Sequence, residues 1–122
     1  MKRAALVVGH GSKLKGFQAA MTKVVRELRK DKTFHFVDCA YLEITSPSIP
    51  AALRALVKKG VQEINILPYF LLSGRHIKQD IPRIVREAKR VYKYRVKIKL
   101  CRYLGYDPRI MSLVKQRIRE GQ

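Results

Sequence analysis

The sequence has no tryptophan, only two cysteines and no apolar run of about 18 residues, and these shortages exclude several classes of protein. Without such a run, no helix can span a membrane. The start of the chain, Met1-Lys2-Arg3, leads straight into a strand-like segment and has neither the length nor the cleavage site of a signal peptide. Cys39 and Cys101 form no CxxC pair, which argues against a disulfide framework or a zinc scaffold. We expect a cytoplasmic protein with one domain over residues 1–122.

Acidic residues are also scarce, with 9 Asp and Glu against 27 Lys and Arg, which gives a net charge of +18. Three explanations are open: binding of nucleic acid, a heavily charged solvated surface, and a small substrate that carries many carboxylates. The basic residues are spread over every predicted helix and the last predicted strand. Arg-Gly repeats and clustered exposed aromatic residues are missing. This distribution disfavours a nucleic-acid partner.

Hydrophobic periodicity predicts strands that alternate with helices along the whole chain. Apolar or alternating runs predict strands, and stripes with steps of three and four residues predict helices. The expected strands lie at 3–9, 34–41, within 61–70 and at 95–101, and the helical stripes run over 17–28, 49–57, 81–91 and 110–118. Repeated βα units predict an α/β fold with a parallel four-stranded sheet, helices on both faces and the flavodoxin-like strand order 2-1-3-4.

Three residues with metal-binding or catalytic potential follow the first three predicted strands: His10, Glu43 and His76. In a parallel sheet, the carboxyl ends of these strands meet at one edge, and the histidines flank the point where the strand order reverses. Two imidazoles and a carboxylate are plausible ligands for a first-row divalent metal and leave coordination positions open. Glu43 could instead accept a proton near the metal. A single histidine more often satisfies a backbone group, the role we assign to His35.

The residues around these histidines have simpler roles that compete with functional ones. Arg75, beside His76, is suited to hold a substrate carboxylate. Ser12, Ser73 and Gly74 are candidate substrate contacts, although Ser12 more simply caps the first helix and the other two more simply form a turn.

Two further features of residues 64–82 have a predominantly structural explanation. Asp80 is predicted to be the N-cap of the third helix, with Pro82 in its first turn, and a hydrogen bond to His76 is the less favoured role. Tyr69 and Phe70 are predicted to lie in the core rather than in a ligand-binding wall.

Two segments resemble a known family, the small single-domain class II chelatases. Residues 6–12 read Leu-Val-Val-Gly-His-Gly-Ser, and residues 67–82 read Leu-Pro-Tyr-Phe-Leu-Leu-Ser-Gly-Arg-His-Ile-Lys-Gln-Asp-Ile-Pro. The chain is similar to the short forms of sirohydrochlorin cobaltochelatase, which are related to siroheme ferrochelatase and to the nickel chelatase of methanogens. The resemblance covers nearly the whole chain.

The resemblance implies an enzyme that inserts Co²⁺ into sirohydrochlorin or precorrin-2 without ATP, with Fe²⁺ or Ni²⁺ insertion as alternatives. It makes His10 and His76 the metal ligands and Glu43 the assisting acid, and it implies no cofactor beyond the substrate metal. The larger relatives contain two such domains in one chain, so the short form is expected to pair as a homodimer. From other classes of function, a metal-delivery protein without catalysis and a basic nucleic-acid-binding domain stay open.

Overall fold

A computed structural model describes residues 1–121 as strands and helices in strict alternation, with one additional helical turn before the third long helix. The elements are β1 Arg3–Gly9, α1 Lys15–Arg29, β2 Phe36–Tyr41, α2 Ile49–Lys58, β3 Glu63–Pro68, the π-helical turn η1 His76–Asp80, α3 Ile81–Val91, β4 Lys97–Leu100 and α4 Pro108–Gly121. No helix within residues 1–121 is both long enough and apolar enough to cross a membrane.

The four strands form one parallel sheet in the order β2-β1-β3-β4, as the sequence predicts. β1 is central and pairs with β2 from Ala4↔Phe36 to Gly9↔Tyr41. All of β1 beyond Arg3 is buried, because helices cover both faces of the sheet. β2 lies on one side of β1, and the later strands β3 and β4 lie on the other side. The point where the strand order reverses, the switch point, therefore lies between the carboxyl ends of β1 and β3.

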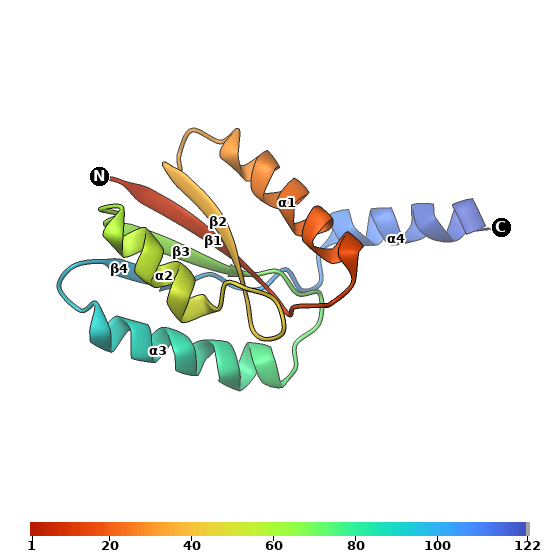
Figure 1. Cartoon of the computed structure of the whole chain (residues 1–122). Coiled ribbons are helices and arrows are strands. Elements are labelled where there is room, and N and C mark those ends of the chain that lie inside the picture. The colour runs from red at the N-terminus through yellow and green to blue at the C-terminus, as the bar shows by residue number, and fades with distance from the viewer. Residues whose placement is uncertain (122) are drawn as a thin grey trace.

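The helices form two outer layers, with α1 on one face of the sheet and α2 and α3 on the other (Figure 1). Successive β1 side chains alternate between these layers: Leu6 and Val8 belong to the cluster that contains α2 and α3, whereas Val7 packs with Met21 of α1. α4 extends away from the sheet toward the C-terminus, and none of Pro108–Gly121 is buried (Figure 1).

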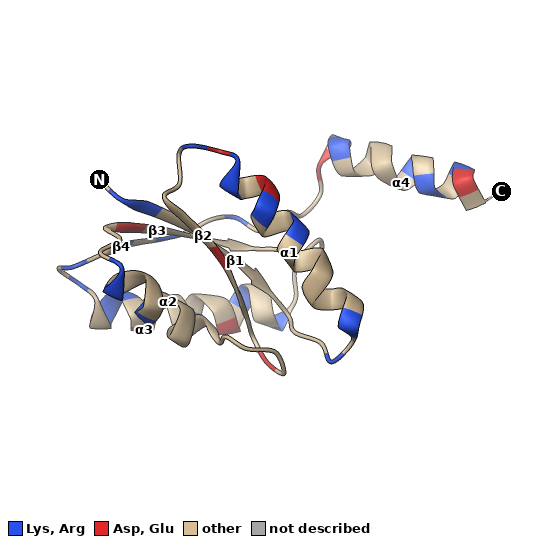
Figure 2. Ribbon diagram, turned by 45° about the horizontal axis from the view of Figure 1, so that its top comes forward, with Lys and Arg blue, Asp and Glu red and all other residues tan. Residues whose placement is uncertain are grey.

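Lys and Arg residues are distributed over the helices and the start of β1 rather than collected on one element (Figure 2). One acidic residue is buried among them: Glu63, at the start of β3, is only 6% exposed. It forms ion pairs with Arg3 of β1 at 3.3 Å and with Lys99 of β4 at 3.2 Å. These neighbours hold the pKa of the Glu63 carboxyl below its usual range, with the hydrogen bond from Lys99 as the largest cause.

The second strand begins at Phe36, two residues later than predicted, because the His35 side chain takes over a strand hydrogen bond. The His35 backbone N–H donates to Arg3 O at 2.8 Å, but the Arg3 N–H donates to His35 Nδ1 at 3.1 Å instead of to a carbonyl. His35 therefore satisfies a backbone group, as expected. β3 lies within the predicted range 61–70, whereas β4, at Lys97–Leu100, is shorter than the predicted 95–101.

Two predicted helix caps are wrong. Asp80 has helical φ and ψ angles of −71° and −50° and makes no capping bond, because the chain is already helical from His76. The Ile81 N–H donates to His76 O, which closes the wide turn. Ser12 does not cap α1, which starts after Leu14; its hydroxyl accepts the Leu14 N–H at 3.1 Å in the preceding loop.

Candidate metal centre

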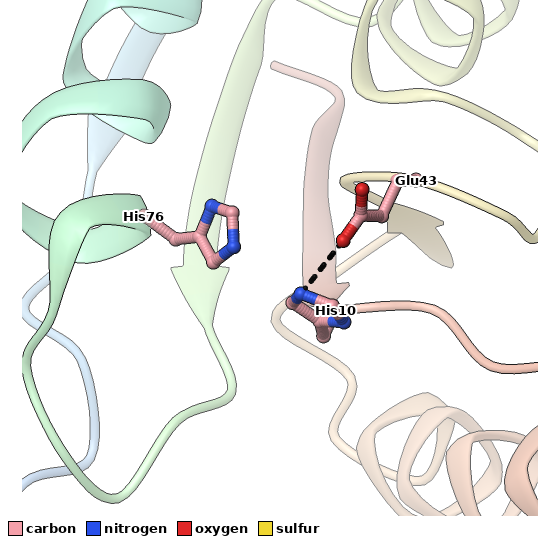
Figure 3. Close-up of side chains that lie close together, drawn as sticks. All are labelled: His10, Glu43 and His76. Atoms are coloured by element: carbon pink, nitrogen blue, oxygen red, sulfur yellow. Dashed lines mark ion pairs between the residues drawn. The ribbon is translucent and has the colours of Figure 1, made fainter.

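His10, Glu43 and His76 converge at the carboxyl edge of the sheet, as the strand order predicts (Figure 3). His10 directly follows β1, Glu43 lies two residues beyond β2, and His76 opens the π-helical turn after β3. One ligand atom from each residue lies within 4.8 Å of the other two. Residues 1–121 contain no other group of three such side chains this close together.

The loops after β1 and β2 are joined by hydrogen bonds that fix His10 relative to Glu43. The Glu43 N–H donates to His10 O at 3.1 Å, and the Leu42 N–H donates to Gly9 O at the same distance. The Thr45 hydroxyl accepts the Ser12 N–H at 2.9 Å and donates to Ser12 O at 3.0 Å. Both loops are therefore held by main-chain contacts, which limits the separation of the two side chains.

Gly11 is required for this close approach. Its φ is +112°, and a Cβ at this position would lie 1.8 Å from the Glu43 carbonyl oxygen. Only glycine leaves room for that oxygen. On the opposite loop, Ile44 adopts φ 69°, a conformation rare for a β-branched residue. The strained Ile44 turn lies directly after Glu43, consistent with the clustering of backbone strain at functional sites.

The polar atoms of His10 and Glu43 face each other at a distance that suits two ligands of one metal ion. His10 Nδ1 lies 3.3 Å from Gly11 O, a carbonyl oxygen that can only accept a hydrogen bond. His10 Nε2 lies 2.9 Å from Glu43 Oε1 (Figure 3). This contact is short enough for a hydrogen bond, and the same two atoms could also share one metal ion. Two ligands about 2.1 Å from one metal are about 3.0–3.4 Å apart, close to the observed separation.

His76 completes the cluster from the other side of the switch point. Its ring packs edge-on against His10, with the ring centroids 4.9 Å apart and the planes inclined at 61°. His76 Nδ1 is held by Asp80 Oδ2 at 2.7 Å, so Nε2 is the nitrogen available to a metal. The side chains of His10, Glu43 and His76 are 44%, 54% and 37% exposed, which leaves the cluster open to an incoming substrate.

An apolar groove of about 500 Å³ lies beside His10. It is lined by Gly9, His10, Phe17, Ala20, Met21 and the segment 69–72. Tyr69, expected in the core, is 41% exposed here, while Phe70 both lines the groove and packs against the core. The sequence contains a signal for this side of the groove, because the apolar run does not stop at the end of β3 but continues through Tyr69–Leu72.

The predicted substrate contacts Ser73, Gly74 and Arg75 are exposed in the loop that leads to His76. Gly74 O accepts the Lys78 N–H at 2.9 Å, which connects this loop to the π-helical turn. Arg75 is positioned at the rim by its place in the chain, immediately before His76. Ser12 is half-buried and anchors the loop after His10.

The fold and the converging side chains together define an α/β protein with a candidate transition-metal site at its sheet edge. The CbiX family model matches residues 4–121, so the chain belongs to the CbiX family. The resemblance to the small class II chelatases is thereby confirmed.

Relatives of two sizes match this chain. A protein of Sulfurisphaera tokodaii named sirohydrochlorin cobaltochelatase is 36% identical over 115 residues, which are 94% of this chain and 90% of that protein. The sirohydrochlorin ferrochelatase of Bacillus subtilis is 32% identical over 121 residues, 98% of this chain but only 46% of the longer protein. The crystal structure of the sirohydrochlorin chelatase SirB from Bacillus subtilis subspecies spizizenii in complex with cobalt superimposes with a TM-score of 0.89 at 29% identity, covering 98% of this chain and 51% of SirB.

Proposed function

We propose that this chain is an ATP-independent sirohydrochlorin cobaltochelatase that inserts Co²⁺ into a sirohydrochlorin-type tetrapyrrole during cobalamin biosynthesis. The observation that carries the proposal is the open cluster of His10, Glu43 and His76, whose ligand atoms lie within 4.8 Å of one another beside an apolar groove. Names of relatives across nearly the whole chain support the same activity.

Metal insertion exchanges one divalent ion for the two pyrrole N–H protons of the macrocycle. His10 and His76 hold the incoming Co²⁺ through Nε2, and because imidazole is a neutral ligand at an open site, the metal can leave for the ring. Glu43 lies against His10 and is 54% exposed, so it is placed to accept one pyrrole proton as the metal–nitrogen bonds form, and the second passes to the imidazole that releases the metal or to water. No cofactor is needed beyond the substrate metal, because the reaction changes no oxidation state.

The groove beside His10 suits the flat face of a tetrapyrrole, and the basic surface suits its carboxylates. Phe17 and Met21 of α1 and Tyr69 after β3 provide an apolar wall for the ring. The net charge of +18 attracts a polyanionic substrate, and Arg75 is suited to pair with a carboxylate at the rim. Ser12, Ser73 and Gly74 supply polar groups near the two histidines.

Cobalt is favoured over iron by the names of the short relatives, since the longer relatives include both a cobaltochelatase of Priestia megaterium and ferrochelatases. The Sulfurisphaera protein, which this chain covers to 90%, is named a cobaltochelatase, whereas the named ferrochelatase of Bacillus subtilis is about twice as long. Ligand chemistry alone does not separate Co²⁺, Fe²⁺ and Ni²⁺, because their affinities at a nitrogen and oxygen site follow one general order. Fe²⁺ insertion is the second candidate, supported by the 32% identity to the ferrochelatase.

The visible spectrum of sirohydrochlorin tests the activity, with Co²⁺, Fe²⁺ and Ni²⁺ compared anaerobically at equal concentration. We expect catalysed insertion of Co²⁺ well above the spontaneous rate. Acceleration with none of the three metals would contradict the proposal. If the protein bound Co²⁺ tightly but did not accelerate insertion, a metal-delivery role would replace it.

We further infer that two copies pair and complete one cleft. The chain corresponds to 46% of the Bacillus ferrochelatase and 51% of SirB, so two copies match the length of one larger relative. The apolar face of α4 is available for such pairing: Leu113, Val114 and Ile118 are 45%, 39% and 60% exposed. Tyr69 and Leu71 line both the groove along α4 and the groove beside His10, so a copy seated on α4 would border the substrate site.

A cytoplasmic location is inferred from the two cysteines, which are both free thiols. Reduced cysteines are usual in the cytoplasm and unusual in oxidising compartments. Fractionation of native cells checks the location, and recovery of the protein outside the cytoplasmic fraction would contradict it.

A further inference from the structure

We propose that Asp80 is a positioning residue that fixes the proton of His76 on Nδ1 and thereby presents the Nε2 lone pair to the metal. This inference rests on the proposed chelatase function for its purpose, but its evidence is a contact within this chain. Asp80 Oδ2 lies 2.7 Å from His76 Nδ1, a short distance typical of a charge-assisted hydrogen bond.

The direction of this hydrogen bond follows from the chemistry of the two groups. An ionised carboxylate can only accept, so the proton of the bond belongs to His76 Nδ1. A neutral imidazole has one proton, and Nε2 is then left with its lone pair. An imidazole free in water prefers the opposite tautomer, with the proton on Nε2, so His76 without Asp80 would present a ligating lone pair on the wrong nitrogen.

Asp80 can reach the ring because the chain is already helical from His76, and side chains four residues apart lie on one face of a helical turn. Residues His76–Asp80 form a turn in which the Ile81 N–H donates to His76 O, five residues back. The first and fifth residues of this wide turn lie on the same side, and the Asp80 side chain is only 23% exposed beneath the His76 ring. Single π-turns of this kind are frequent at functional sites.

An ion pair with Arg83 does not explain why Asp80 lies in this position. Arg83 Nη2 lies 3.6 Å from Asp80 Oδ1, and the Arg83 side chain is 71% exposed. An exposed ion pair of this length contributes little to stability. The shorter and more buried contact is the one to His76, which indicates that Asp80 acts on the histidine and not on the helix.

The three histidines provide an internal comparison for an NMR test. His35 Nδ1 accepts the Arg3 N–H, so a neutral His35 must carry its proton on Nε2. Long-range ¹H–¹⁵N spectra of the metal-free protein near pH 8 should therefore show His35 as the Nε2–H tautomer and His76 as the Nδ1–H tautomer. In Asp80→Ala the His76 signal should move to the Nε2–H pattern, while His35 should not change.

Titration with Co²⁺ alone, followed by its visible absorption, measures how Asp80 affects the affinity for the metal in the absence of a tetrapyrrole. Loss of a carboxylate that orients a ligating histidine typically weakens metal binding about 10–100-fold, and we expect this for Asp80→Ala. Asp80→Asn keeps the shape but not the charge, so its affinity should lie between those of the wild type and Asp80→Ala. Glu87→Gln is the matched control, because Glu87 forms an i,i+3 ion pair with Arg90 on the same helix. Its Co²⁺ affinity and its histidine spectrum should equal those of the wild type.

Two results would overturn the proposal: an Nδ1–H tautomer of His76 that persists in both Asp80 variants, or Co²⁺ affinities of both variants equal to that of Glu87→Gln. Failure of the wild type to accelerate metal insertion would contradict the chelatase function instead. The spectra and the Co²⁺ titration would still decide the role of Asp80, because neither depends on turnover.

Discussion

At the scale of single residues, the candidate metal centre depends on contacts between loops that are far apart in the sequence. Gly11 and Glu43 come from the loops after β1 and β2, and the Glu43 carbonyl occupies the space where a Gly11 side chain would be. The His10 and Glu43 side chains then face each other at 2.9 Å. His10 and Glu43 are therefore positioned by the close packing of their loops at Gly11, a residue that has no side chain to bind a metal.

Gly11→Ala should destabilise the protein and disturb the site. The left-handed backbone alone costs a non-glycine residue roughly 1–3 kcal/mol, and the clash with Glu43 O adds to it. Urea unfolding measures the change. Gly16→Ala is the control: Gly16 lies in α1 with open space around it, so alanine should stabilise the helix by about 0.5–1 kcal/mol. Equal effects of the two substitutions would contradict the close approach at Gly11.

Glu43→Gln should lower the insertion rate at saturating Co²⁺ by about 10²–10⁴-fold, because an amide cannot accept the pyrrole proton. Glu27→Gln removes a carboxylate from an exposed ion pair with Lys30 and should leave the rate unchanged. Initial rates over a range of Co²⁺ concentrations separate the two possible effects. An unchanged rate at saturation with weaker Co²⁺ binding would make Glu43 a ligand and not the proton acceptor.

The sequence predicts which residues meet at this site but not how they are held. His10, Glu43 and His76 follow strands that must be parallel in a chain of βα units, so their convergence is a consequence of topology. The Asp80 contact depends on a helical turn that already begins at His76, whereas Asp80 followed by Ile81 and Pro82 has the pattern of an ordinary helix start. Hydrophobic periodicity carries no information about a hydrogen bond that spans five residues.

At the scale of secondary-structure elements, Glu63 connects three strands of the sheet. It lies in β3 and pairs with Arg3 of β1 and Lys99 of β4. Lys99 belongs to the alternating basic and apolar run that predicts the edge strand, and β4 occupies the edge of the sheet. The buried carboxylate thus gives two basic side chains of neighbouring strands a common partner.

The stability contributed by Glu63 should depend on pH in a defined direction. Its pKa is lower in the folded protein than in the unfolded chain, so its ion pairs stabilise the fold fully above the unfolded pKa of about 4.3. This contribution is lost as the pH falls through the lower folded pKa. Urea unfolding measures the difference in unfolding free energy between the wild type and Glu63→Gln, which should be larger at pH 7 and smaller in acid. A difference that stays constant over this pH range would contradict the lowered pKa of Glu63.

The helices were predictable from their apolar stripes, and the burial of the stripes differs between them. In α2 the stripe residues Ile49, Ala52, Leu53 and Leu56 are all buried, as such a pattern predicts. α4 begins at Pro108 and contains the predicted stripe over 110–118, but this chain buries none of that stripe. An apolar stripe shows which face of a helix is hydrophobic, but not whether the same chain buries that face.

At the scale of the whole molecule, the exposed stripe of α4 and the strong positive charge both point to partners outside the chain. The apolar face of α4 continues through Tyr69 and Leu71 to the groove beside His10. A second copy seated there would cover apolar surface and enclose the substrate site. The charge is a property of composition and was known from the sequence, whereas the site for pairing required the structure.

Leu113→Asp should convert a dimer into a monomer, because it places a charge in the apolar face of α4. Size-exclusion chromatography with light scattering should give twice 14.1 kDa for the wild type and 14.1 kDa for the variant. Val91→Asp is the control, since Val91 is an exposed apolar residue of α3, 48% exposed, away from α4. A monomeric wild type would contradict the pairing, as would a dimer that tolerates Leu113→Asp.

The most direct test of the central claim is the rate of Co²⁺ insertion into sirohydrochlorin by three single histidine variants, followed by visible absorption. His10→Ala and His76→Ala each remove one proposed metal ligand and should reduce the rate to the spontaneous background. His35→Ala removes a histidine that accepts the Arg3 N–H and lies outside the cluster of His10, Glu43 and His76, so its rate at saturating substrate should remain near that of the wild type. Full activity in both His10→Ala and His76→Ala would contradict the assignment of the metal centre.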